Sequence, residues 1–340
     1  MKTLYTLKST TASLLVISAM ALGANTAQAS LVLLDSFNGN VGVSSDGFGS
    51  KTTDPGIISA SVPVGSIVEK AYLYTSGNSN TIGGVTFNGS AITFGPAVPN
   101  TSTCCGLTSA RADVTSLIKS TIDAGPGGVY DFGISESSTN SGQDGEALVV
   151  VYSNPTLPTA TVGVLDGFSD AGGDSFAINF ADPLDPTDPG FFAEMALGIG
   201  FSCNNQSSTV SVNGTTITNN AGNFDDGQSG SCRNGNLITV GGFNDPLSAL
   251  LPSYANDHER YNLKPYVSAG DTTINVRTNN PTNDDNIFLA TFYVSGNAGI
   301  NQPPPPPPPP PTGVPEPGTL ALLGLGLAGI GFSRRRRTKK

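Results

Sequence analysis

Two nine-residue stretches, VTFNGSAIT at residues 85–93 and VSVNGTTIT at residues 210–218, decide the fold. In each stretch, apolar and polar residues alternate on both sides of an Asn-Gly pair. Alternation with a period of two is typical of a half-buried β-strand. Asn-Gly favours a two-residue hairpin turn, because both residues tolerate a positive φ angle. Each stretch therefore predicts an antiparallel β-hairpin.

The second stretch lies 125 residues after the first, and further similarities surround both copies. Their order along the chain is kept, which indicates an internal duplication. We expect two homologous modules, residues 30–155 and 156–300, joined near Asn154. The aligned segments are Glu69 with Glu194, Ala71 with Ala196, Val41–Val43 with Val162–Val164, Asp46–Phe48 with Asp166–Phe168, and Leu148–Tyr152 with Leu289–Tyr293.

The composition indicates an all-β fold. The chain has 42 Gly and 25 Pro but no Trp and one His, and many short strands between Gly, Asn and Ser turns favour antiparallel sandwiches. Apolar runs at 147–152 and 287–294 predict buried central strands. Asp113 is the expected N-cap of one short helix. We predict two tandem jelly-roll-like β-sandwiches, each large enough to bury its own core.

The first 29 residues have the order of a secretory signal peptide. Lys2 and Lys8 precede an apolar stretch, and Ala27-Gln28-Ala29, with its two small residues, follows it. The apolar stretch is short for a bilayer core, which argues against a permanent anchor. We predict cleavage before Ser30 and export from the cytosol.

The C-terminal end has several distinct parts. Residues 301–313 contain nine consecutive prolines, which favour a stiff polyproline II linker. Residues 314–340 contain Pro315, Glu316 and Pro317, then a short apolar segment that predicts a hydrophobic helix, and then a basic cluster. Such a helix is marginal as a permanent anchor but sufficient to hold a chain briefly at a membrane. The cluster that would keep it there consists of Arg334, Arg335, Arg336 and Arg337.

The order of these C-terminal parts resembles a PEP-CTERM sorting signal. The resemblance covers only about 25 residues and brings no catalytic residues. It implies an exosortase-type membrane protease as partner, transient anchoring at the inner membrane, and a Gram-negative bacterium that makes exopolysaccharide. We therefore expect an exported protein of the cell surface or extracellular matrix.

The charge of the predicted mature body restricts its partners. The precursor has a formal charge of −10, but residues 30–300 carry 25 acidic and 8 basic residues, an excess of 17 negative charges. Phosphate backbones would be repelled, so nucleic acid is not an expected partner. Divalent cations fit this charge, and an anionic exopolysaccharide fits only through such cations or through neutral patches.

Four cysteines in an exported chain predict structural disulfides. Cys203 and Cys232 lie in the second module and are the expected pair. Cys104 and Cys105 are adjacent, and a bond between neighbours closes a strained ring. Cross-pairing of these two with the other cysteines therefore stays open.

Aspartates gather in several predicted loops, with two interpretations. Hard oxygen ligands in flexible loops suit Ca²⁺. Aspartate is also a common turn residue, because its side chain bonds nearby backbone N–H groups. No EF-hand pattern is present, and both interpretations stay open. The candidate calcium ligands are Asp166, Asp170, Asp174, Asp182, Asp185 and Asp188.

No residue pattern predicts a catalytic site. His258 is the single histidine and lacks a Gly-x-Ser-x-Gly partner motif, so a surface loop is expected for it. Glycosidases need two carboxylates across the scissile bond, and spacing along the chain selects no pair. Tyr72, Tyr74 and Phe201 could stack on sugars, although strand aromatics more often belong to the core. We therefore expect no enzyme.

The first module also resembles, less specifically, repeats of secreted bacterial surface proteins. The similarity rests on Ala112–Thr115, Gly145–Tyr152 and Asp166–Phe168, and it implies a surface module without an assigned activity. The leading hypothesis is a structural or adhesive protein of the surface or matrix. A calcium-assisted carbohydrate-binding module is the first alternative, and a secreted hydrolase is the second.

Overall fold

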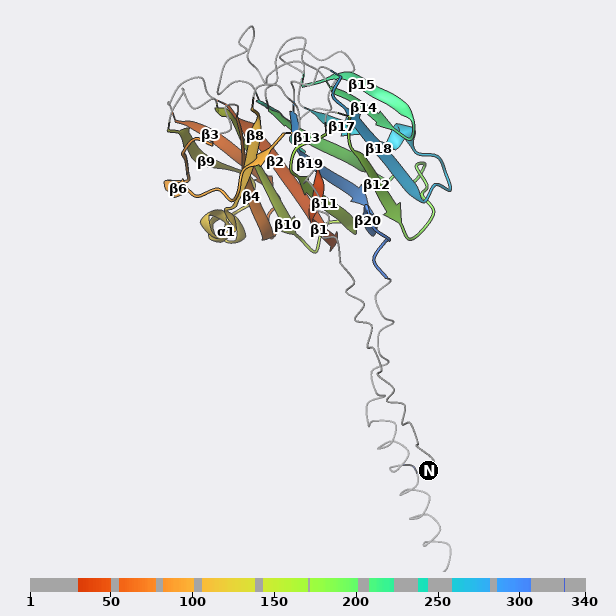
Figure 1. Ribbon diagram of the computed structural model, residues 1–340. Coiled ribbons are helices and arrows are strands. Elements are labelled where there is room, and N and C mark those ends of the chain that lie inside the picture. The colour runs from red at the N-terminus through yellow and green to blue at the C-terminus, as the bar shows by residue number, and fades with distance from the viewer. Residues whose placement is uncertain are drawn as a thin grey trace, which may run out of the picture.

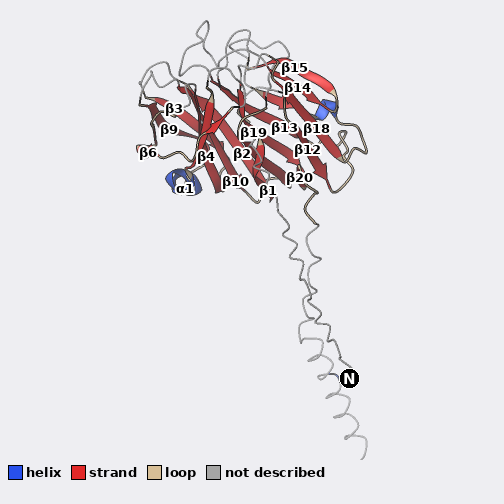
Figure 2. Ribbon diagram, viewed as in Figure 1, coloured by secondary structure: helices blue, strands red, loops and turns tan. Residues whose placement is uncertain are grey.

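Four antiparallel β-sheets lie face to face in one body (Figure 1). We call them, in spatial order, outer sheet 1, inner sheet 1, inner sheet 2 and outer sheet 2. Strands make up most of the secondary structure, and helix α1 lies at one end of the first sandwich (Figure 2). The computed structural model describes residues 30–49, 55–77, 82–100, 106–137, 143–170, 172–200, 208–222, 238–243, 259–281 and 286–306, and Leu327.

The first sandwich consists of outer sheet 1, with strand order β3-β9-β5-β6, and inner sheet 1, with order β2-β10-β4-β8-β7. Its elements are β2 (Val41–Phe48), β3 (Gly56–Val62), β4 (Ile67–Gly77), β5 (Val85–Phe87), β6 (Ser90–Ile92), β7 (Val98–Pro99), β8 (Thr108–Asp113), α1 (Thr115–Asp123), β9 (Gly128–Glu136) and β10 (Gln143–Ser153).

The second sandwich consists of inner sheet 2, with order β1-β11-β19-β13-β16 and β17 beside β13, and outer sheet 2, with order β15-β14-β18-β12-β20. Its elements are β1 (Val32–Gly39), β11 (Ala160–Asp166), β12 (Ser175–Phe180), β13 (Ala193–Gly200), β14 (Ser208–Val212), β15 (Thr215–Ala221), β16 (Ile238–Val240), β17 (Arg260–Asn262), the 3₁₀ turn η1 (Lys264–Tyr266), β18 (Thr273–Asn279), β19 (Asn286–Ser295) and β20 (Ala298–Ile300).

The strand orders of the two sandwiches correspond. β2-β10-β4-β8 in inner sheet 1 matches β11-β19-β13-β16 in inner sheet 2, and β3-β9-β5-β6 matches β12-β18-β14-β15. The second sandwich has two additional strands at one side, β1 beside β11 and β20 beside β12. Strand β1 thus precedes the first sandwich in sequence but pairs with the second.

Three apolar cores hold the four layers together. One core lies within each sandwich, and a central core lies between the two inner sheets. The central core includes Val149 and Val151 from β10 and Phe288 and Leu289 from β19. Both faces of these two strands are therefore covered, which explains their continuous apolar sequences. The all-β prediction is confirmed.

Both predicted hairpins form around left-handed turns. Asn88 and Gly89 have φ angles of 47° and 76°, and Asn213 and Gly214 have 47° and 81°. The predicted helix also forms, but it begins at Thr115, with Val114 as its N-cap residue. Asp113 still contributes there, because its Oδ1 accepts a hydrogen bond of 3.0 Å from the Thr115 backbone N–H.

Several predicted features lie outside the described residues. These are the signal peptide, the four cysteines, most of the proline run, Phe201, His258, the sorting signal and its arginine cluster. In the part of the chain that the structure describes, we find no helix of the length and apolarity that a membrane crossing requires.

Candidate functional site

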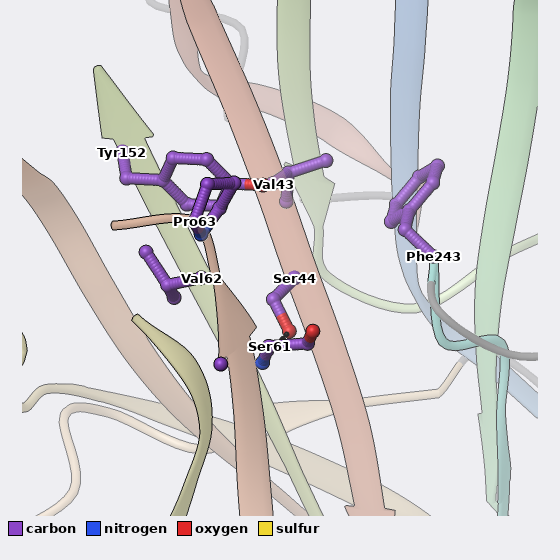
Figure 3. Close-up of a pocket in the computed structure, with 8 residues that line it drawn as sticks. Val43, Ser44, Ser61, Val62, Pro63, Tyr152 and Phe243 are labelled. Carbon is purple, nitrogen blue, oxygen red and sulfur yellow. Dashed lines mark hydrogen bonds between the residues drawn. The ribbon is translucent and has the colours of Figure 1, made fainter. Parts of the chain in front are cut away.

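A groove of about 250 Å³ opens at the side of the first sandwich where β2 and β3 lie next to each other (Figure 3). Tyr152 and Phe243 bring aromatic rings to its wall. Phe243 follows β16, so the groove draws residues from both halves of the chain. The lining residues are Val43, Ser44, Ser61, Val62, Pro63, Gly128, Tyr152 and Phe243.

Gly42 gives Tyr152 the space for its position. In the Val41-Gly42-Val43 sequence, both valines belong to the central core, so Gly42 faces the opposite side of the sheet. A Cβ atom at Gly42 would lie 2.7 Å from atoms of the Tyr152 ring. Burial raises the pKa of Tyr152 to about 12, so its hydroxyl keeps its proton at neutral pH and can donate a hydrogen bond.

Side chains of β2 occupy the backbone donors along the outer edge of β3. The Ser59 N–H donates to Asp46 Oδ2 at 2.6 Å, and the Ser61 N–H donates to Ser44 Oγ at 2.9 Å. Unpaired edge donors would otherwise invite another strand. Beside the groove, the edge of β3 is therefore already satisfied by hydrogen bonds.

A second cavity, of about 300 Å³, lies between the two inner sheets. Arg111 from β8 forms an ion pair there with Asp166 from β11. Burial raises the pKa of Asp166 above its ordinary value, although the Arg111 charge acts in the opposite direction. The Tyr74 hydroxyl lies on the same wall, next to the charges of Arg111 and Asp166. An acceptor, a donor and a hydroxyl thus meet at one small cavity.

Tyr72 extends this network from the first sandwich to the second. Its hydroxyl bonds the carboxylate of Asp35 on β1, and its ring lies 5.5 Å from the Arg111 guanidinium. Both Tyr72 and Tyr74 are buried in the central core. The core interpretation of these two tyrosines is therefore confirmed, and a role as an exposed sugar platform is wrong for them.

The first three predicted calcium ligands have separate protein partners. Asp166 pairs with Arg111, as described above. Asp170 accepts a hydrogen bond from the Gly172 N–H at 2.8 Å. Asp174 is buried and accepts a hydrogen bond from Ser30 Oγ at 2.8 Å.

The other three, Asp182, Asp185 and Asp188, line one cavity of about 250 Å³ beside β12. Asp185 accepts bonds from the Thr187 N–H and hydroxyl, and Asp188 accepts one from the Gly190 N–H. These are the turn hydrogen bonds that the alternative interpretation predicts. Over the described residues, no group of three or more His, Cys, Asp or Glu side chains could hold a metal ion. Calcium binding stays a prediction.

Sequence reasoning missed a buried pair of glutamates in the core of the first sandwich. Glu136 ends β9 and Glu146 lies in β10, and both are almost inaccessible to solvent. Gln143 Nε2 and Thr75 Oγ1 donate to Glu146 Oε1 at 2.6 and 3.2 Å. The alternation of β9 could have revealed Glu136, because every second residue of this strand, Phe132, Ile134 and then Glu136, faces the core.

Burial raises the pKa of Glu136 to about 10 and that of Glu146 to about 8. Repulsion between the two carboxylates adds to the shift of Glu136. When both carboxyl groups are ionised, Glu136 Oε1 and Oε2 and Glu146 Oε2 lack a hydrogen-bond donor among the described residues. Protons held by the pair supply the missing donors. The pair is therefore a proton-holding element of the core.

Comparison with known protein families identifies one segment. Residues 313–337 match the PEP-CTERM protein-sorting motif, the segment that the proline, glutamate and arginine pattern predicted. A comparison with curated proteins finds no match. The described body thus precedes a sorting motif. We conclude that this chain is an exported protein, of a kind made by Gram-negative bacteria, whose PEP-CTERM sorting motif is read by an exosortase.

Proposed function

We propose that the protein is a non-enzymatic structural or adhesive component of the cell surface or extracellular matrix. The observation that carries the proposal is the sorting motif at 313–337 behind a body of four packed β-layers. The two inner sheets bury their apolar faces against each other, so the two sandwiches form one unit. A strongly acidic surface and a proline linker suit a protein that is held outside the cell. Brief anchoring through the C-terminal helix at the inner membrane would precede its release.

We further infer that each sandwich is a jelly roll. Counting strands from β2 and omitting the short β7, inner sheet 1 holds the first, eighth, third and sixth strands, and outer sheet 1 holds the second, seventh, fourth and fifth. Two four-stranded sheets joined in this alternating way have the connectivity of two Greek keys. The second sandwich repeats the order when strands are counted from β11 and the short β17 is omitted.

Mass spectrometry of the protein from its native cells tests the sorting step. We expect a mature N-terminus at Ser30 and a C-terminus near Pro317. Replacing Pro315, Glu316 and Pro317 with alanine should leave the arginine tail attached and the protein in the membrane fraction. An intact tail on the unaltered protein would overturn the proposed route.

The structural role needs a separate test. Cells that lack the protein should lose matrix cohesion, measured as polysaccharide released by gentle shear. Cells that make the processed protein should retain matrix cohesion. Breakdown of the host polysaccharide by the purified protein would contradict the non-enzymatic role and favour the hydrolase alternative.

The Arg111 cavity supports carbohydrate binding as a second candidate function. Its ion pair offers both donors and acceptors to sugar hydroxyls, and its volume is close to the lower end of small-molecule sites, roughly 300 Å³. We would titrate the host polysaccharide into the protein by calorimetry, with and without EGTA. If Arg111→Lys weakens the binding, the result would support this cavity as the binding site. Loss of binding in EGTA would support a requirement for calcium. No heat in either condition would remove this candidate.

A further inference from the structure

We propose that the groove between Tyr152 and Phe243 binds the proline run of a second copy of this chain. The inference rests on the structural role proposed above and names the partner for it. The groove residues are those of Figure 3, and the occupant is the segment 303–311, nine consecutive prolines. A contact of this kind joins two different surfaces of the copies, and the rotation between the copies determines whether rings or open chains form.

In the second sandwich, a chain segment occupies the equivalent place in the fold. In the second sandwich, Gly163 is the counterpart of Gly42, and a Cβ atom there would lie 2.8 Å from Ile300. Ile300 belongs to β20, which pairs with the outer side of β12. The corresponding side of β3 has no such strand among the described residues. The segment that occupies the second sandwich leads directly into the prolines.

Hydrogen bonding at the groove favours a proline segment over another β-strand. The N–H groups of Ser59 and Ser61 are already bonded to side chains of β2, so the carbonyl groups of an added strand would find these two donors occupied. A proline run has no N–H groups and offers only carbonyl acceptors. The Tyr152 hydroxyl can donate to such a carbonyl, because its pKa of about 12 keeps it protonated.

The wall of the groove has the chemistry of known proline-binding surfaces. Proline segments in the polyproline II form bind grooves that are lined by aromatic side chains, and their preformed shape reduces the entropy lost on binding. Tyr152, Phe243 and Pro63 provide such a wall, together with Val43 and Val62. The proline run itself has no charge and meets no repulsion in the groove, whereas the two acidic bodies repel each other and salt screens that repulsion.

Binding of a synthetic nine-proline peptide to the protein purified from its native cells tests the groove. We expect the proline peptide to bind saturably and to reduce self-association of the protein. A nine-residue Gly-Ser peptide should not bind. Tyr152→Phe keeps the ring but removes the hydrogen-bond donor, and it should lower the affinity for the peptide by about fivefold. Tyr266→Phe, at a half-buried tyrosine of the second sandwich, is the matched control and should change nothing.

Sedimentation velocity then tests the assembly. The unaltered protein should associate with rising concentration, and a variant with residues 303–311 replaced by Gly and Ser should stay monomeric. Equal affinity for both peptides, or equal association of both proteins, would overturn the proposal. Loss of saccharide binding in Tyr152→Phe would assign the groove to carbohydrate instead. If these tests fail while matrix cohesion still depends on the protein, the structural role stands without this groove.

Discussion

At the scale of single residues, the ion pairs differ in how much solvent reaches them. The side chains of Lys70 and Asp113 are 41% and 47% exposed, whereas Asp166 beside Arg111 is 14% exposed. Exposed pairs contribute little to stability, because water and salt screen them. A charge that is left without its partner in a buried place costs much more.

Arg111→Met should therefore lower the free energy of unfolding by about 1–3 kcal/mol, because Asp166 keeps its burial and loses its cation. Lys70→Met is the control and should change stability by less than about 0.5 kcal/mol. Urea unfolding measures both. Recovery in the double variant Arg111→Met with Asp166→Asn would identify the lost charge pair as the cause, whereas equal effects of the two single variants would contradict it.

The buried glutamate pair predicts how stability varies with pH. The native pKa values of Glu136 and Glu146, about 10 and about 8, exceed the ordinary glutamate value. The native state therefore holds protons that the unfolded chain releases above pH ~4.3. Stability falls as the pH rises from there to the native values, by up to about 1.4 kcal/mol per pH unit for each group.

Glu136→Gln should flatten this dependence, because the amide carries no charge to bury at high pH. Urea midpoints at pH 5, 7 and 9 would measure it, with the exposed Asp182→Asn as control. We expect the stability of the variant, relative to that of the unaltered protein, to increase as the pH rises. The same slope in both would show that Glu136 does not hold a proton.

At the scale of elements, the two hairpins show how local sequence controls a turn. Gly89 has a φ of 76°, and nothing lies within 4 Å of a Cβ atom built there. Gly133 in β9 also has open space around such an atom, but it has no left-handed φ. The space around the added atom is therefore alike at the two glycines, and the backbone angle differs.

Gly89→Ala should cost about 1–2 kcal/mol, because a left-handed backbone brings the added Cβ close to the next carbonyl. Gly133→Ala should be neutral or stabilise slightly, because alanine restricts the unfolded chain. Thermal unfolding of both variants checks this. A penalty at Gly133 equal to that at Gly89 would show that space, not φ, limits these positions.

Strand β4 shows where the sequence alignment of the two copies fails. Ala71 belongs to the core of the first sandwich. Its aligned partner Ala196 lies between Met195 and Leu197, which face the core of the second sandwich, so Ala196 points away from that core. An irregularity in the pairing of β4 near Lys70 adds one residue, and a shift of one residue reverses the side that every following side chain faces.

At the scale of the whole molecule, the central core joins the two sandwiches. Val41 and Val43 from the first copy and Val162 and Val164 from the second meet in it. Both copies thus use the same face of the equivalent sheet, as subunits do in a symmetric dimer. Neither inner sheet could lose its partner without exposing an apolar face.

The two halves should therefore unfold together. Phe288→Ala in the central core should remove about 3–5 kcal/mol, and Phe87→Ala in the first sandwich should lower the same single transition. Scanning calorimetry tests this by comparing calorimetric and van't Hoff enthalpies. Two separate peaks, of which Phe87→Ala moves only one, would contradict the shared core.

The sequence alone determined the features that depend on neighbouring residues. Asn88 and Gly89 set their turn within two residues, the repeat at 210–218 indicated the duplication, and the motif at 313–337 is a linear signal. Only the tertiary structure decided that the four sheets form one stack, that β1 joins the second sandwich, and that Arg111 meets Asp166. Those contacts join residues far apart in sequence, and local preferences carry no information about which distant surface will cover a given apolar face.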